Sequence, residues 1–79
     1  MRIFDCDADK SIKTIILYLK IEEAIELYDS LNTLTKRNEL TDHTHINDST
    51  FEHEITISLY DEQKIDMLND KSKEIILNE

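Results

Sequence analysis

The sequence of 79 residues contains no glycine, no proline and no tryptophan. The lack of glycine excludes the Gly-rich phosphate-binding loops of P-loop and Rossmann proteins, because those loops bring a backbone without Cβ atoms next to the phosphate. It also excludes the strained G-x-S-x-G turn that presents a nucleophilic serine. Turns must therefore be built from Asn, Asp and Ser, which tolerate a left-handed backbone better than most residues do.

Cysteine and long hydrophobic runs are also scarce. The single cysteine, Cys6, has no internal disulfide partner, which is typical of a reducing compartment such as the cytoplasm. Its neighbours Asp5 and Asp7 disfavour the thiolate that a nucleophilic cysteine needs. The acidic N-terminus does not resemble a signal peptide, and no stretch approaches the roughly 20 apolar residues of a membrane span. The sequence therefore predicts a cytoplasmic protein.

Acidic residues are abundant: 18 Asp and Glu stand against 9 Lys and Arg, which gives a net charge of −9. This balance argues against binding to DNA, RNA or an anionic membrane, because those contacts need Lys and Arg to neutralise phosphates. A basic protein remains a suitable partner. The alternative is that the charge only keeps a small protein soluble.

The segment from Thr14 to Arg37 organises the chain. Its first third is rich in β-branched and aromatic residues and predicts a strand. From Ile21 onward, apolar residues recur at helical spacing and predict a helix with one buried stripe. We expect this stripe to contain Ala24, Leu27, Tyr28, Leu31 and Leu34.

The remaining patterns predict, in order, strands over 1–6, 12–19, 43–46 and 51–60 and a final helix after Asp61. The length predicts a single domain over 1–79 with a modest core. The predicted fold is therefore α+β, in the order ββαββα, with one largely antiparallel sheet and both helices on one face. The open face would carry Ile16, Tyr18 and Tyr60, which predicts a homodimer through that face or through an edge strand.

Histidines form the one cluster with possible metal chemistry. If Asn47–Thr50 closes a tight hairpin, Ile46 faces Phe51, and His45 and His43 lie opposite Glu52 and Glu54. Two imidazoles and two carboxylates could bind Zn²⁺ or another divalent ion. The favoured alternative is an exposed His–Glu ion pair without metal, so no cofactor is expected.

His53 is predicted to lie on the apolar side of its strand. There we expect a partly buried imidazole with a hydrogen-bond partner.

Acidic residues on the exposed side of the predicted helix are the main candidates for binding a partner. These are Glu22, Glu23, Glu26 and Asp29, and a second set, Glu52 and Glu54, lies on the predicted strand over 51–60. No nucleophile with a base and an orienting group is recognisable, so no catalytic residue and no enzymatic activity are expected.

These observations favour a small non-enzymatic interaction protein. It would be a stoichiometric inhibitor of a basic protein that handles nucleic acid, or of a toxin or defence protein, with carboxylates in place of phosphates. One alternative is a metal- or ligand-binding module that uses His43 and His45. Another is a dimeric structural domain whose partner the sequence does not identify.

Three stretches resemble a group of small uncharacterised bacterial and phage proteins: Tyr18–Leu31 with its Glu22-Glu23-Ala24 run, His43-Thr44-His45, and Glu54–Tyr60. Those proteins have a strand, a Glu-Glu-Ala helix, a His-rich turn and a closing strand. The resemblance covers about Ile15 to Tyr60 and implies no activity. This chain departs from the group at Lys20-Ile21, where the others have Thr-Pro, and in its shorter His-rich segment.

Overall fold

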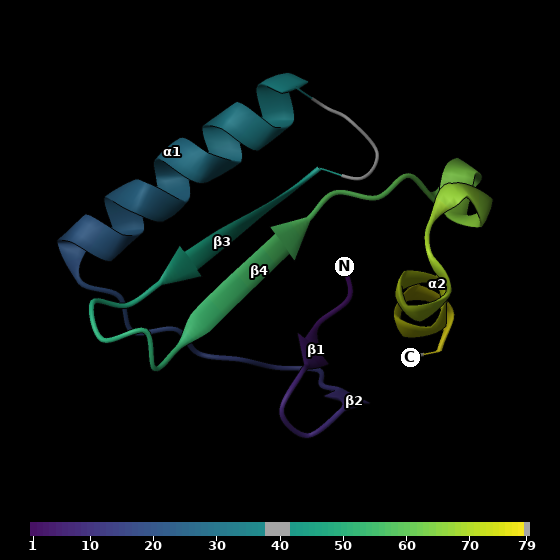
Figure 1. Cartoon of the computed structure of the whole chain (residues 1–79), viewed down its shortest axis with the longest axis horizontal. Coiled ribbons are helices and arrows are strands. Elements are labelled where there is room, and N and C mark those ends of the chain that lie inside the picture. Colours follow the sequence, from purple (N-terminus) through teal and green to yellow (C-terminus); the bar gives the residue numbers. More distant parts are fainter. Residues whose placement is uncertain (38–41, 79) are drawn as a thin grey trace. The chain divides into compact units, whose positions relative to one another are not determined.

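The computed structural model describes residues 1–37 and 42–78. The elements follow the order β, β, α, β, β, 3-10 helix, α, and the protein has an α+β fold as predicted (Figure 1).

The chain divides into two compact units. The central unit is Tyr18–Asp61, and the terminal unit combines Met1–Leu17 with Glu62–Glu79. The single domain over 1–79 remains a prediction, and each unit is described by itself.

The central unit consists of one helix against one hairpin. Helix α1 (Ile21–Arg37) packs against β3 (His43–Asn47), which pairs with β4 (Glu54–Ser58) in an antiparallel sheet (Figure 1). Side chains alternate between a covered and an exposed face along both strands. Leu34 and Ile46, each 3% exposed, are the most deeply buried of the described residues.

Helix α1 begins where the sequence predicts, but with an unusual cap. Lys20 occupies the N-cap position, because its carbonyl accepts the first helical hydrogen bond from the Ala24 N–H at 2.9 Å. The Lys20 N–H in turn donates to Oε1 of Glu23 at 2.8 Å. This second contact is the Glu half of a capping box, which secures the helix start although no Ser, Thr or Asp stands at the cap.

The buried stripe of α1 is narrower than predicted. Leu34 is buried, and Ala24, Leu27 and Leu31 are half-buried, as expected. Tyr28, however, is 69% exposed, so its assignment to the core was wrong. A two-stranded sheet covers only a narrow strip of a helix, and each residue lies about 100° around the axis from the one before it. Ser30 lies on the covered side instead.

The predicted strand over 12–19 is absent. Only β1 (Phe4–Asp5) and β2 (Lys10–Ser11) form a hairpin in this region, and residues 13–20 belong to no helix or strand. The described strands therefore form two separate two-stranded antiparallel sheets rather than one larger sheet. A strand needs a neighbour for its backbone hydrogen bonds, and no described strand pairs with this segment.

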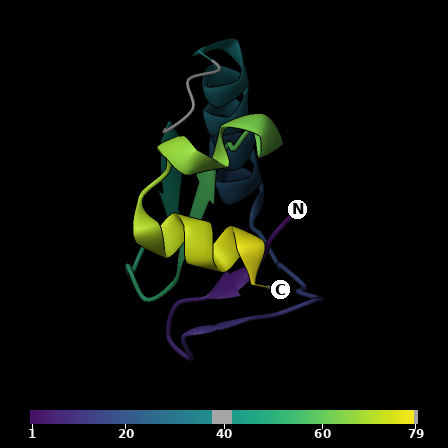
Figure 2. The same ribbon diagram turned by 90° about the vertical axis from the view of Figure 1, so that its right-hand side faces the viewer.

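The terminal unit joins the two ends of the chain. It contains the β1–β2 hairpin, a 3-10 helix η1 (Glu62–Met67) and helix α2 (Asp70–Leu77), so the predicted final helix is interrupted (Figure 2). Nε of Arg2 donates to the Ile76 carbonyl at 2.7 Å, which fixes the N-terminal segment to α2. None of the helices in the described ranges is long and apolar enough to cross a membrane.

Acidic and amide side chains form the turns, as the absence of glycine predicts. Oδ1 of Asp5 accepts the N–H groups of Asp7 and Ala8 at 3.0 and 3.1 Å, and Asp9 adopts a left-handed backbone with φ of 54°. Asn69 caps α2 by accepting the Ser72 N–H at 2.8 Å. These short polar side chains supply hydrogen bonds that stabilise non-helical backbone.

We predict that Leu34→Ala lowers the free energy of unfolding by about 2–5 kcal/mol, because it leaves a cavity between α1 and the hairpin. Tyr28→Ala on the same helix is the control and should change that free energy by no more than about 0.5 kcal/mol. Urea unfolding followed by circular dichroism measures both values. Equal effects of the two substitutions would contradict the assignment of the covered side of α1.

Candidate interaction surface

The outward side of α1 carries a row of carboxylates. Glu22, Glu26 and Asp29 are exposed and lie at i, i+4 and i+7, so they follow one another along one side of the helix. None of the three has an ion-pair partner within residues 1–37 and 42–78. We call these three residues the acidic ridge. It presents three negative charges on one helix, none of them in an ion pair within the described residues.

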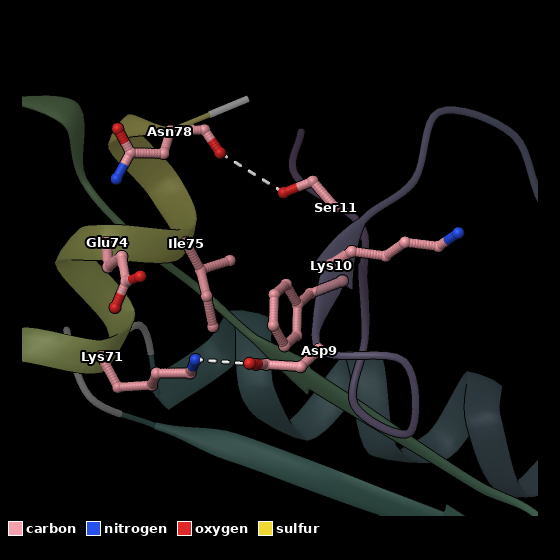
Figure 3. Close-up of a pocket in the computed structure, with 8 residues that line it drawn as sticks. Asp9, Lys10, Ser11, Lys71, Glu74, Ile75 and Asn78 are labelled. Carbon is pink, nitrogen blue, oxygen red and sulfur yellow. Dashed lines mark hydrogen bonds and ion pairs between the residues drawn. The ribbon is translucent and has the colours of Figure 1, made fainter.

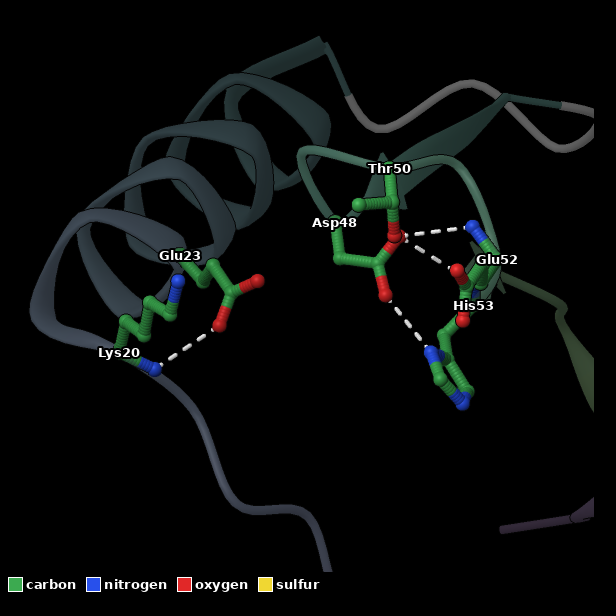
Figure 4. A network of polar contacts seen from close by, with 6 residues as sticks. All are labelled: Lys20, Glu23, Asp48, Thr50, Glu52 and His53. Atoms are coloured by element: carbon green, nitrogen blue, oxygen red, sulfur yellow. Dashed lines mark hydrogen bonds and ion pairs between the residues drawn. The ribbon is translucent and has the colours of Figure 1, made fainter.

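Glu23, the fourth residue predicted for this ridge, has a different environment. Its side chain is half-buried, and its carboxylate accepts the N–H of Lys20 at the start of α1 (Figure 4). This contact ties Glu23 to the helix cap, so we do not include it in the acidic ridge.

An apolar row lies beside the acidic ridge. Ile21, Ile25 and Tyr28 are 69%, 53% and 69% exposed and share the i, i+4, i+7 spacing. The acidic ridge and this apolar row together are called the outer face of α1. The sequence interpretation missed the apolar row because it placed Tyr28 in the core and gave no position to Ile21 and Ile25. Their offset from the Leu27–Leu31–Leu34 stripe is the signal that could have revealed it.

The second predicted acidic pair is split by the register of the β3–β4 hairpin. Ile46 lies opposite Ile55 and His45 opposite Thr56, so the predicted pairing of Ile46 with Phe51 is wrong by four residues. The loop runs from Asp48 to His53 instead of Asn47–Thr50. Glu54 stays on the exposed face of β4, whereas Glu52 moves into the loop.

Histidines 43 and 45 therefore meet only one of the two glutamates. Nδ1 of His45 lies 2.6 Å from Oε1 of Glu54 and 2.9 Å from the Thr56 hydroxyl. The His43 ring meets the His45 ring edge to face, with centroids 4.9 Å apart. No group of three or more His, Cys, Asp or Glu residues suited to a metal ion is found in the described part of the chain. A direct contact between a histidine and a glutamate is thus present as predicted, but it joins His45 to Glu54 instead of to Glu52.

Asp48 organises the hairpin loop (Figure 4). Its Oδ1 accepts the N–H groups of Glu52 at 2.9 Å and of His53 at 3.3 Å, and its Oδ2 lies 2.6 Å from Nδ1 of His53. The predicted hydrogen-bond partner of His53 is thus present, but the predicted burial is wrong, because the imidazole is 82% exposed. Asp48 holds the loop at the register that excludes Glu52 from the strand.

The contact between Asp48 and His53 changes the acidity of both groups. Their hydrogen bond raises the pKa of His53 above its ordinary 6.5 and lowers the pKa of Asp48 below its ordinary 3.8. The His53 contribution to stability is complete below pH 6.5 and disappears as the pH rises through the raised pKa. The Asp48 contribution is complete above pH 3.8 and disappears as the pH falls through the lowered pKa. Both are present together between pH 3.8 and 6.5.

The terminal unit contains a small pocket of about 170 Å³ (Figure 3). Ligand pockets usually measure about 300–1,000 Å³. Nζ of Lys71 lies 3.0 Å from Oδ1 of Asp9 and 5.1 Å from the centre of the Phe4 ring, so its charge is already paired. The pocket is a packing gap between α2 and the β1–β2 hairpin and offers no evident ligand chemistry.

Comparison with protein families, with curated proteins and with solved structures finds no match to this chain.

We predict that Asp48→Asn returns the pKa of His53 toward 6.5, because the charge that stabilises the imidazolium is removed. The amide oxygen of Asn can still accept the N–H groups of Glu52 and His53, so the loop should persist. An NMR titration of the histidine ring protons measures the shift. Glu54→Gln is the matched control and should leave the His53 titration unchanged. An unaltered His53 titration in Asp48→Asn would contradict the assigned contact.

Proposed function

We propose that this chain is a small acidic, non-enzymatic interaction protein that binds a basic partner through the outer face of α1. By occupying the functional groove of that partner, it acts as a stoichiometric inhibitor. The observation that carries the proposal is the exposure of Tyr28 and Ile25 directly beside the unpaired carboxylates of Glu26 and Asp29. A surface that only kept the protein soluble would not need exposed apolar side chains in that position.

Apolar and acidic groups contribute differently to such a complex. Tyrosine is enriched among the residues that dominate binding energy, and Tyr28 with Ile25 can fill an apolar pocket in the partner. The carboxylates of the acidic ridge would accelerate association with a positively charged surface and exclude neutral or acidic competitors. Proteins often occupy a partner's groove with a helix whose contacting side chains lie at positions i, i+4 and i+7.

The spacing of the acidic ridge suits a partner that binds nucleic acid. Successive carboxylates are separated by about 6 and 4.5 Å along the helix axis, since each residue rises about 1.5 Å. Phosphates of one DNA strand follow one another at about 3.4 Å along the duplex axis, so each carboxylate step falls between one and two phosphate steps. We therefore favour a nucleic-acid-handling enzyme, or a toxin or defence protein with a basic groove, as the inhibited partner.

The first test reverses charge on the ridge. Glu26→Lys with Asp29→Lys should slow association with the partner at least tenfold and reduce its dependence on salt. The matched control is Glu62→Lys with Asp66→Lys, which changes the net charge equally on the exposed side of η1. Partners captured from the source cell are identified by mass spectrometry, and surface plasmon resonance gives the rates. If both double variants lost binding equally, the net charge of the protein and not the position of the acidic ridge would explain the loss.

A second test removes the apolar anchor. Tyr28→Ala should weaken binding by about 2 kcal/mol, which is about thirtyfold in Kd, as for a central interface residue. The Tyr28 side chain is 69% exposed, so circular dichroism should show an unchanged fold. Isothermal titration calorimetry with the captured partner measures both Kd and stoichiometry. Unchanged affinity would exclude the apolar row from the interface.

A further inference from the structure

The segment Lys13–Lys20 has the sequence of a strand but no strand partner. Its exposed fractions alternate: Ile16 and Tyr18 are 74% and 91% exposed, whereas Ile15, Leu17 and Leu19 are 47%, 48% and 37% exposed. Within the described residues, the backbone groups from Thr14 to Leu19 form no hydrogen bonds. Unpaired backbone in an apolar, β-branched sequence favours pairing with another strand.

Strand β4 has an edge that can accept such a segment. In the part of the chain that the structure describes, β4 pairs with β3 alone, so its other edge carries unpaired backbone groups. Addition of an extended segment to an exposed sheet edge is a recurrent mode of protein recognition.

One antiparallel register matches the two strands in both charge and polarity. It sets Lys20 opposite Glu54 and Lys13 opposite Asp61. The apolar side chains then pair on the face that α1 covers: Leu19 with Ile55, Leu17 with Ile57 and Ile15 with Leu59. A shift by one residue turns these side chains to the wrong face. A shift by two residues leaves Lys13 opposite Leu59 or Gln63, so at least one charge pair is lost.

We propose that a second copy of this chain supplies the missing strand. Residues 13–20 of each protomer pair with β4 of the other, which produces a two-fold symmetric dimer with two identical strand additions. Charge complementarity favours this arrangement over direct pairing of the two 13–20 segments. Antiparallel pairing of the two 13–20 segments with each other, centred on Ile16 and Leu17, would oppose Lys13 to Lys20 and is repulsive. The dimer uses a different surface from the outer face of α1 and does not depend on the proposed inhibition.

Two single charge reversals test the arrangement. Lys20→Glu alone and Glu54→Lys alone each oppose like charges at both ends of the symmetric contact, so each should weaken dimerisation at least tenfold. An equimolar mixture of the two variants restores an opposite-charge pair at both contacts. Sedimentation velocity should therefore show a dimer for the wild type and for the mixture, and mostly monomer for each variant alone.

Both substitutions are suited to this test. Lys20 contributes its backbone to the cap of α1, and an acidic side chain at a helix start is favourable. Glu54 is 52% exposed and contacts His45. Circular dichroism of each variant verifies the fold. Wild type that stays monomeric at about 100 μM would overturn the proposal, and so would a mixture that stays as monomeric as its components.

A cross-link provides a second readout that does not depend on charge reversal. In a Cys6→Ser background, Tyr18→Cys of one copy and Thr56→Cys of another lie opposite each other in the proposed register, within the reach of a disulfide. Mild oxidation of the mixed variants should give a covalent dimer. The control mixture of Tyr18→Cys with Thr35→Cys, on the exposed side of α1, should not cross-link. Equal yields in the two mixtures would overturn the register.

Discussion

The packing of α1 on the β3–β4 hairpin is the contact on which the central unit depends. A two-stranded hairpin is marginally stable by itself in water, and most of the stability of a helix of 17 residues comes from burying its apolar side. Leu34 on the helix and Ile46 on the hairpin are the most buried residues of this contact, since each is only 3% exposed. The hairpin covers one narrow side of α1, and within the described residues of the central unit nothing covers the opposite side. The outer face of α1 is thus a direct consequence of how little sheet the fold contains.

Because the chain has no glycine, its turns are stabilised by side-chain oxygens of Asp and Asn residues. Asp5, Asp48 and Asn69 each accept backbone N–H groups that would otherwise be unpaired. The replacement has a cost at Phe51, whose left-handed backbone with φ of 57° is unfavourable for a bulky residue by about 1–2 kcal/mol. The Asp48 carboxylate stabilises this conformation by accepting hydrogen bonds from the N–H groups of Glu52 and His53, the two residues that follow Phe51. One side chain therefore both bonds the loop backbone and raises the pKa of His53.

The sequence predicted what depends on local pattern and failed where tertiary neighbours decide. The α+β order, the start of α1 at Ile21 and the Asp-based turns were predicted correctly because propensity and spacing determine them. The hairpin register was wrong by four residues; an even shift leaves the faces unchanged, so His45 and Glu54 still meet while Glu52 does not. The core position of Tyr28 and the strand over 12–19 were wrong because periodicity gives neither the width of a covering sheet nor the presence of a partner strand.

Some acidic residues stabilise the fold through hydrogen bonds, whereas others make no such contact within the described residues. Asp5, Glu23 and Asp48 accept hydrogen bonds from the backbone, so their negative charge has a structural explanation. Glu22 lies in the first turn of α1, where a carboxylate stabilises the helix dipole, but Glu26 and Asp29 have no such role, and like charges at i, i+4 destabilise a helix by about 0.2–0.5 kcal/mol per pair. A net charge of −9 would keep the protein soluble wherever the carboxylates stood. Solubility therefore does not explain why Glu26 and Asp29 lie beside an exposed apolar row on the same helix, whereas the proposed recognition of a basic, partly apolar groove would account for both rows.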